Sequence, residues 1–87
     1  MSNVEKTAAA LRAEFWALPP EALVDRETQA AVRYVSVATI EAEAIRGGGV
    51  PYRRIGRRAL STKADILARL MAAPKVENTA QLSTEAA

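Results

Sequence analysis

The residues best suited to chemistry in this chain are four arginines in one short stretch: Arg53, Arg54, Arg57 and Arg58. Guanidinium groups stay protonated and bind phosphate oxygens through two parallel hydrogen bonds. Residues 46–63 contain six basic residues and no acidic one, whereas residues 1–45 hold four Lys or Arg against seven Asp or Glu. This asymmetry predicts a surface that binds an anion, and a solvated hairpin without a partner is the competing interpretation.

Catalytic chemistry finds little support in the sequence. The chain has no His and no Cys, which removes the commonest general base, thiolate nucleophiles, disulfides and the usual zinc ligands. Glu41 and Glu43 lie two positions apart on an expected helix and point in different directions, and Asp65 is better explained as a capping residue. The glycines at 47–49 are not followed by the Gly-Lys-Ser/Thr sequence of a phosphate-binding loop. We therefore expect no enzymatic activity, no catalytic residue, no cofactor and no metal site.

Length and composition describe one small domain. The 87 residues are 49% apolar and 25% charged, which leaves little room for a cleft between lobes. No apolar run approaches the roughly 20 residues that span a bilayer, and the first eleven residues include the acidic Glu5 instead of a basic segment followed by an apolar one. We expect a cytoplasmic protein with no membrane partner.

The N-terminal residues 3–17 predict an amphipathic helix. Apolar residues recur there at steps of four and three: Val4, Ala8, Leu11, Phe15 and Leu18. Pro19 and Pro20 end this helix, because the residue before a proline is disfavoured in the α region. The favoured interpretation of its face at Leu11, Phe15 and Trp16 is packing against the domain, and self-association is the alternative.

Residues 23–49 predict two short helices joined by a tight turn. Asp25 is a good N-cap for a helix that runs to about Tyr34, and Ser36 is the N-cap of the next helix. Spacings of three and four place one stripe of the second helix in the core: Val37, Ile40 and Ala44. Its other residues are expected to point outward: Ala38, Thr39, Ala42, Glu43 and Arg46. The glycines at 47–49 end the helix.

Residues 52–60 predict a small hairpin around Gly56. Its arginines are expected to face out, and three apolar or aromatic side chains are expected to face in: Tyr52, Ile55 and Leu60. Thr62, with Asp65 three residues later, resembles a capping box for a last helix from Lys63 to about Ala72, closed by Pro74. The tail that follows lacks an apolar period and is expected to be disordered.

The order helix, turn, helix, glycine stop, basic hairpin and helix is typical of a winged helix-turn-helix. Residues 23–71 resemble the MerR-like excisionase and AlpA-like group of small bacterial DNA-binding proteins. The motifs that carry the resemblance are Ala22-Leu23-Val24-Asp25-Arg26, Val35-Ser36-Val37-Ala38-Thr39-Ile40, the glycine and arginine stretch 49–58, and the last helix at 63–70. Where members of this group often have an Arg-Trp or Arg-Arg pair, this chain has Ala42-Glu43-Ala44.

The resemblance implies a mainly α fold, a winged helix-turn-helix with a small two-stranded β wing. The chain then divides into an N-terminal helical extension (1–20), the DNA-binding domain (21–73) and a disordered tail (74–87). The implied function is that of an excisionase, or recombination directionality factor, in the bacterial cytoplasm. Several copies would bind repeated sites on double-stranded DNA cooperatively through self-association, bend the DNA and assist an integrase in excising a mobile element.

Candidate DNA-binding residues come from the second helix of the pair, the hairpin and the start of the last helix: Ser36, Ala38, Thr39, Glu43, Arg46, Tyr52, Arg53, Arg54, Arg57, Arg58 and Lys63. Thr39, Glu43 and Arg46 are expected to reach base edges, and the hairpin arginines to reach phosphates or the minor groove. A small transcriptional regulator of a prophage or integrative element would use the same fold. A further alternative is a protein-interaction module in which the hairpin is incidental and the N-terminal helix contacts a partner, because Glu41 and Glu43 would repel phosphates.

Overall fold

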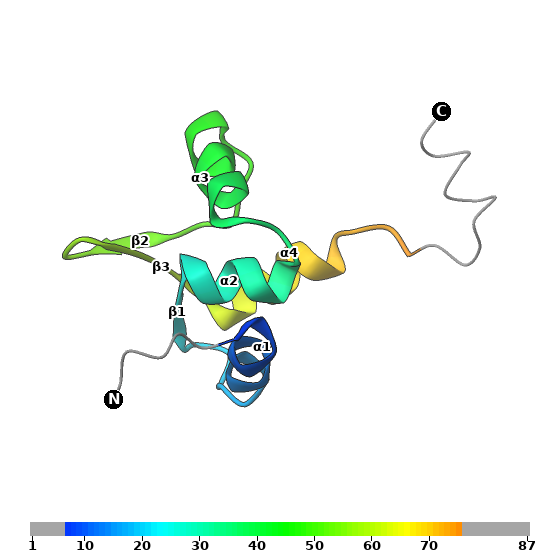
Figure 1. Ribbon diagram of the computed structural model, residues 1–87. Helices are drawn as coiled ribbons and strands as arrows, with labels where there is room; N and C mark the ends of the chain where they lie inside the picture. The colour runs from blue at the N-terminus through cyan, green and yellow to red at the C-terminus, as the bar shows by residue number, and fades with distance from the viewer. Residues whose placement is uncertain (1–6, 76–87) are drawn as a thin grey trace.

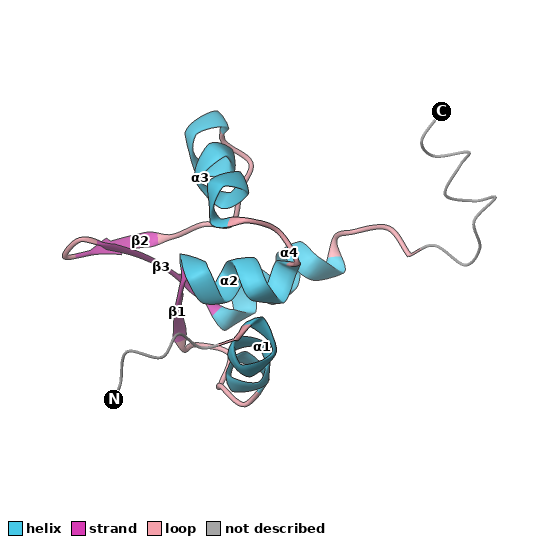
Figure 2. Ribbon diagram, viewed as in Figure 1, coloured by secondary structure: helices cyan, strands magenta, loops and turns pink. Residues whose placement is uncertain are grey.

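A third strand makes this fold mixed α/β. The computed structural model describes residues 7–75, and within them it contains four helices and a three-stranded antiparallel sheet (Figures 1 and 2). In chain order the elements are α1 (Ala8–Trp16), β1 (Leu23–Asp25), α2 (Arg26–Arg33), α3 (Val37–Arg46), β2 (Arg53–Ile55), β3 (Arg58–Thr62) and α4 (Lys63–Met71). The expectation of a mainly α fold with a two-stranded wing is corrected by this sheet. Helix, turn, helix and basic hairpin are compatible with a winged helix-turn-helix.

The sheet has the strand order β1-β3-β2. Strand β1 pairs with the end of β3 that leads into α4, with Val24 opposite Ser61, while β2 pairs with the other end, with Arg54 opposite Ala59. Leu60 pairs with both outer strands. The hairpin of β2 and β3 therefore extends beyond β1 and projects from the helical body (Figure 1). A strand of three residues is too short to leave a periodic signal, which is why β1 was not predicted from the sequence.

The predicted starts of the last three helices are confirmed. The side-chain oxygens of Asp25, Ser36 and Thr62 each accept the backbone N–H three residues later, at 2.9, 3.1 and 3.1 Å. Such caps satisfy N–H groups that have no partner inside the helix. Helix α1 begins after Thr7, so the first part of the predicted helix over 3–17 lies outside the described residues, as does the predicted tail beyond Lys75.

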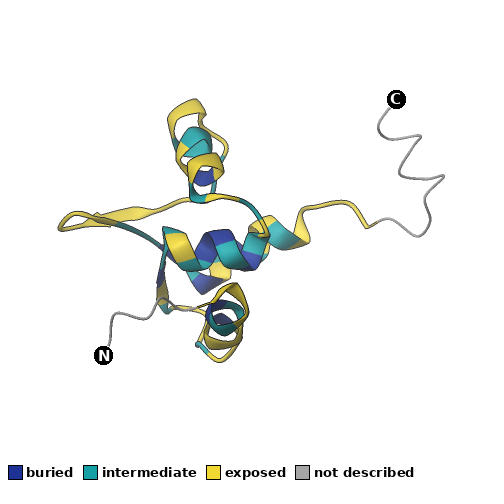
Figure 3. Cartoon of the chain, viewed as in Figure 1, coloured by how far each residue is buried: buried dark blue, intermediate teal, exposed yellow. Residues whose placement is uncertain are grey.

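Helix α1 belongs to the same core as the rest of the domain. Phe15 on α1 and Ile66 on α4 are fully buried and form the centre of the core with Val24 and Val32. Figure 3 shows buried segments on α1 and on α2, which pack against each other. The predicted packing of the α1 face is thus confirmed for Phe15 and Leu11, whereas Trp16 is exposed. No helix within residues 7–75 is long and apolar enough to cross a bilayer.

Candidate nucleic-acid interface

A tight turn sets the position of α3 relative to α2. Tyr34 ends α2 in the left-handed conformation, with φ 61° and ψ 39°, which is uncommon for a residue other than glycine. The backbone N–H of the next residue, Val35, donates to the carbonyl of Ala30 at 3.1 Å. The guanidinium of Arg12 on α1 lies 4.0 Å from the centre of the Tyr34 ring. The backbone hydrogen bond of Val35 and the contact of Arg12 with the Tyr34 side chain therefore both stabilise the turn between the two helices.

The exposure of α3 follows the predicted pattern at several positions. Ile40 is buried, and Ala38, Thr39 and Arg46 are exposed as expected. Val37 and Ala44, expected in the core, are half-buried, and so is Ala42, which was expected to point outward. Ser36 is also exposed, and its hydroxyl lies 3.0 Å from the hydroxyl of Thr39. The expected outward orientation of Glu43 is wrong.

Glu43 instead connects α3 to two other helices. Arg33 on α2 donates two hydrogen bonds of 2.9 Å to its carboxylate oxygens, and Arg69 on α4 lies 3.5 Å from Oε2. The side chains of Arg33 and Glu43 are only 7% and 13% exposed. Arg33 also donates to Gln29 Oε1 at 2.9 Å. Hydrogen bonding from Arg33 lowers the pKa of Glu43, against the opposing effect of burial, so that the carboxylate stays ionised.

Lys63 also differs from its predicted position. Its side chain is turned inward, the residue is 8% exposed, and Nζ donates to the carbonyl oxygens of Trp16 and Leu18 at 3.0 and 2.6 Å. These carbonyls lie at and just beyond the end of α1, where they have no partner within the helix. The structure therefore places the Lys63 ammonium group under α1 and away from the surface that α3 and the hairpin share.

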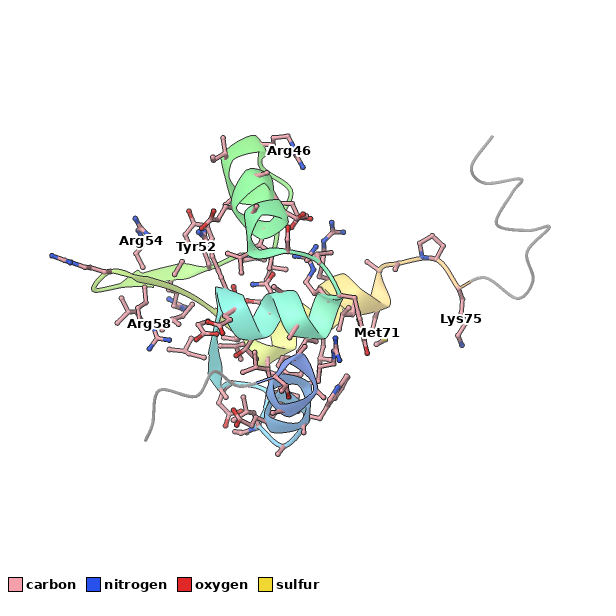
Figure 4. All side chains as sticks on the ribbon, in the orientation of Figure 1. Arg46, Tyr52, Arg54, Arg58, Met71 and Lys75 are labelled. Carbon is pink, nitrogen blue, oxygen red and sulfur yellow. The ribbon has the colours of Figure 1, made fainter. Side chains whose placement is uncertain are left out.

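The register of the hairpin divides its arginines between two faces. Directly opposed residues share a face and neighbours alternate, so Arg54 and Ala59 lie on one face, and the other carries Arg53, Ile55, Arg58 and Leu60. Figure 4 agrees, because Arg54 and Arg58 point to opposite sides of the hairpin and Arg54 lies on the side of α3. The expected inward face is wrong for Tyr52 and Ile55, which are 45% and 49% exposed. Leu60 is half-buried.

Two contacts connect the hairpin and the residue before it to β1 and α2. Arg58 donates to Oδ2 of Asp25, the N-cap of α2, at 2.9 Å, and the guanidinium of Arg26 lies 4.9 Å from the centre of the Tyr52 ring. The two-residue turn between β2 and β3 begins with Gly56 at φ 64°, and two-residue hairpin turns require a positive φ at this position. Sequence reasoning missed the contact of Arg26 with the hairpin, because its partner Tyr52 is 26 positions away and no local pattern connects the two residues.

The positive charge that remains without an acidic partner is spread along the hairpin, from the start of β2 to the turn. Within residues 7–75, no ion pair or hydrogen bond involves the side chains of Arg53, Arg54 or Arg57. An open hollow of about 390 Å³ lies between the start of α2, α3 and the hairpin. Its lining carries charges of both signs, from Asp25, Arg26, Glu27, Glu41, Arg54, Arg57 and Arg58. The acidic groups of this lining come from β1, α2 and α3, whereas the hairpin carries only basic charge.

Sequence reasoning also missed Ile45. This residue falls outside the buried stripe of α3, yet it is the most exposed large hydrophobic residue described, at 87%. Its spacing of five from Ile40, which places it on the far side of the helix, was a signal that could have been used.

Within the described part of the chain, no group of three or more His, Cys, Asp or Glu residues could hold a metal ion. Comparison with family models, with curated proteins and with solved structures gives no match to this chain. The assignment of function therefore rests on the geometry and charge of α3 and the hairpin.

Proposed function

We propose that this protein binds double-stranded DNA through α3 and the β2–β3 hairpin. The observation that carries the proposal is a projecting basic hairpin beside a helix with an exposed outer face. Three arginines of this hairpin have no acidic partner in the described structure: Arg53, Arg54 and Arg57. An α-helix fits the major groove of B-form DNA. Arginines on a narrow hairpin suit the phosphates beside that groove or the adjacent minor groove.

The two faces of the hairpin have different roles in this proposal. Arg54 lies on the side of α3, so it suits the strand that borders the groove occupied by the helix (Figure 4). Arg58 is held by Asp25 at 2.9 Å, so it orients the hairpin on α2 and contributes less free charge than its neighbours. Arg57, at the turn, has the longest reach from the body.

A protein-interaction module is the second class of function, and the structure removes part of its support. That interpretation came from two acidic residues on α3. Glu43 is paired with Arg33 inside the domain and does not present its charge outward. Glu41 is the one remaining acidic residue on this helix, and it lines the hollow that also holds Arg54 and Arg57. Repulsion of phosphates is correspondingly smaller than the sequence suggested.

The finer proposal is an excisionase, supported by the resemblance of residues 23–71 to the MerR-like excisionase and AlpA-like group. In this role several copies bind repeated sites, associate on the DNA, bend it and assist an integrase. Leu11 and Phe15 are buried in the domain, so association between copies would use other surfaces. A small transcriptional regulator built on the same elements is the alternative within DNA binding.

The salt dependence of binding tests the proposal. The full chain is titrated onto a labelled duplex of mixed sequence at several salt concentrations, and the logarithm of the affinity should fall linearly with the logarithm of the salt concentration. Substituting Arg54 and Arg57 together by Ala should reduce the slope by about two units, close to one for each phosphate that is no longer neutralised. Lys75→Ala, which removes a positive charge on the far side of the molecule from the hairpin (Figure 4), should leave the slope unchanged. Equal slopes for all three proteins would contradict the assignment of the hairpin.

The role in excision needs a measurement in the cell. Raised expression of the protein should increase the product in which the attachment site of the mobile element is rejoined, as measured by amplification across the junction. Duplexes with the bound site at permuted positions should also migrate differently in a gel, because a bent fragment migrates according to the position of the bend. Altered transcription from a nearby promoter, with neither excision nor bending, would favour the regulator.

A further inference from the structure

The outward face of α3 is centred on an apolar side chain. Ile45 is 87% exposed although it lies on a helix that we place against DNA. At about 100° for each residue, it lies about 140° around the helix from the buried Ile40. Ala38 and Ala42 lie about 160° from Ile40, one on each side of the direction opposite Ile40, and Ile45 is on the same side as Ala38. An isoleucine in this position gains nothing from the core of its own domain.

Polar groups on this face are few and lie at its flanks. Glu43 is engaged by Arg33 and Arg69, and the hydroxyl of Thr39 lies within hydrogen-bonding distance of Ser36 Oγ, at 3.0 Å. By helical position, Glu41 lies on the flank toward the hollow and Arg46 on the opposite flank. The middle of the face can therefore offer van der Waals contact but not a hydrogen bond.

The charges around Ile45 favour DNA over an apolar protein partner. Arg46 follows it directly and is exposed, and the hollow on the other flank joins α3 to the arginines of the hairpin. The apolar centre thus has Arg46 on one flank, and on the other Glu41 with the hairpin arginines across the hollow. Such a surface suits the major groove, where the C5-methyl group of thymine is the one apolar feature of the base edges. Met71 on α4 is also exposed, but it lies away from α3 and the hairpin (Figure 4).

We infer that Ile45 contacts a thymine methyl group in the major groove and determines a preference for thymine at that position. The inference rests on the DNA binding proposed above and adds a residue that determines specificity. Readout by α3 is then largely apolar, with Arg46 and Glu41 as its polar neighbours.

Replacing thymine by deoxyuridine tests the contact, because this change removes the methyl group and leaves the base pairing unchanged. Sites are first selected with the full chain from a pool of random duplexes, and each thymine of the selected site is then replaced in turn. For the wild-type protein, one or two replacements should weaken binding about fourfold, the change expected for one methyl group returned to water. For Ile45→Ala the same replacements should change the affinity less than twofold. Met71→Ala, another exposed apolar residue shortened to Ala, should keep the fourfold difference.

Each outcome decides the inference. Wild-type binding that is insensitive to deoxyuridine at every position would overturn it, as would an Ile45→Ala protein that keeps the fourfold difference. Either result, with the salt dependence of binding intact, leaves the proposed DNA binding in place and removes only the role of Ile45. Failure to retain any duplex, or a salt slope near zero, would instead remove the proposed function and the inference with it. Circular dichroism of Ile45→Ala should match the wild type, since the side chain lies outside the core.

Discussion

Removing the carboxylate of Glu43 should destabilise the fold instead of altering the preference for bases. Glu43→Ala removes two hydrogen bonds of 2.9 Å from Arg33 and the ion pair with Arg69 at 3.5 Å. Arg33, whose side chain is 7% exposed, keeps its hydrogen bond to Gln29. The expected decrease in the free energy of unfolding is about 2 to 4 kcal/mol, between the value of one charged hydrogen bond and that of breaking a buried ion pair. For a domain of this size, the melting temperature should fall by about 8 to 30 °C.

Thermal and urea unfolding of the full chain measure this decrease, and Glu41→Ala is the matched control. It removes the same residue type from the same helix at an exposed position, so its stability should stay within about 0.5 kcal/mol of the wild type. Equal stability of Glu43→Ala and the wild type would refute the argument that this ion network holds α3 to α2 and α4. A changed sequence preference of folded Glu43→Ala, with an unchanged melting temperature, would return Glu43 to the DNA-facing role predicted from sequence.

Three further measurements bear on the ionised and strained groups of the domain. Hydrogen bonding from Arg33 lowers the pKa of Glu43 below 4.5, so the stabilising effect of the ionised carboxylate is complete above pH 4.5 and is lost as the pH falls through the lowered pKa. The difference in unfolding free energy between wild type and Glu43→Gln, measured by urea titration, should therefore shrink below about pH 4.5. Lys63→Met keeps an unbranched apolar chain but removes both hydrogen bonds to the carbonyls of Trp16 and Leu18. It should lower the free energy of unfolding by about 1 to 3 kcal/mol, and an unchanged midpoint of urea unfolding would contradict the capping role of Lys63. Tyr34→Gly relieves about 1 kcal/mol of left-handed backbone strain and removes the cation–π interaction with Arg12, whereas Tyr34→Val removes that interaction and keeps the strain. The valine variant should therefore have the lower melting temperature, and the reverse order would refute the strain.

Local interactions were the part of this structure that could be predicted from the sequence. The N-caps at Asp25, Ser36 and Thr62 depend on one side chain and an N–H three residues later, so a short stretch of sequence contains the whole interaction. The buried position of Ile40 and the exposure of Arg46 follow in the same way from the helical repeat.

Long-range partners explain what sequence reasoning missed. Glu43 is ten positions from Arg33, and Lys63 is more than forty positions from the carbonyls that it caps, so each charged residue was expected at the surface for want of a visible partner. The orientation of Ile55 was wrong for a related reason. Alternation along a strand says which residues share a face, but the body of the domain ends near Leu60 and does not cover either face of the hairpin further out.

The hairpin extends past β1, so its length can change without a change in the core of the domain. Strand β1 stops pairing opposite Leu60, and the residues from Ile55 to Arg58 extend past it, outside the core. Two residues added to each strand at the turn would carry the tip about 7 Å further, since a strand rises about 3.4 Å per residue. An even number of added residues keeps every existing side chain on its present face. The span between α3 and Arg57 in the turn is therefore a length that insertions and deletions can adjust while the folded body stays the same.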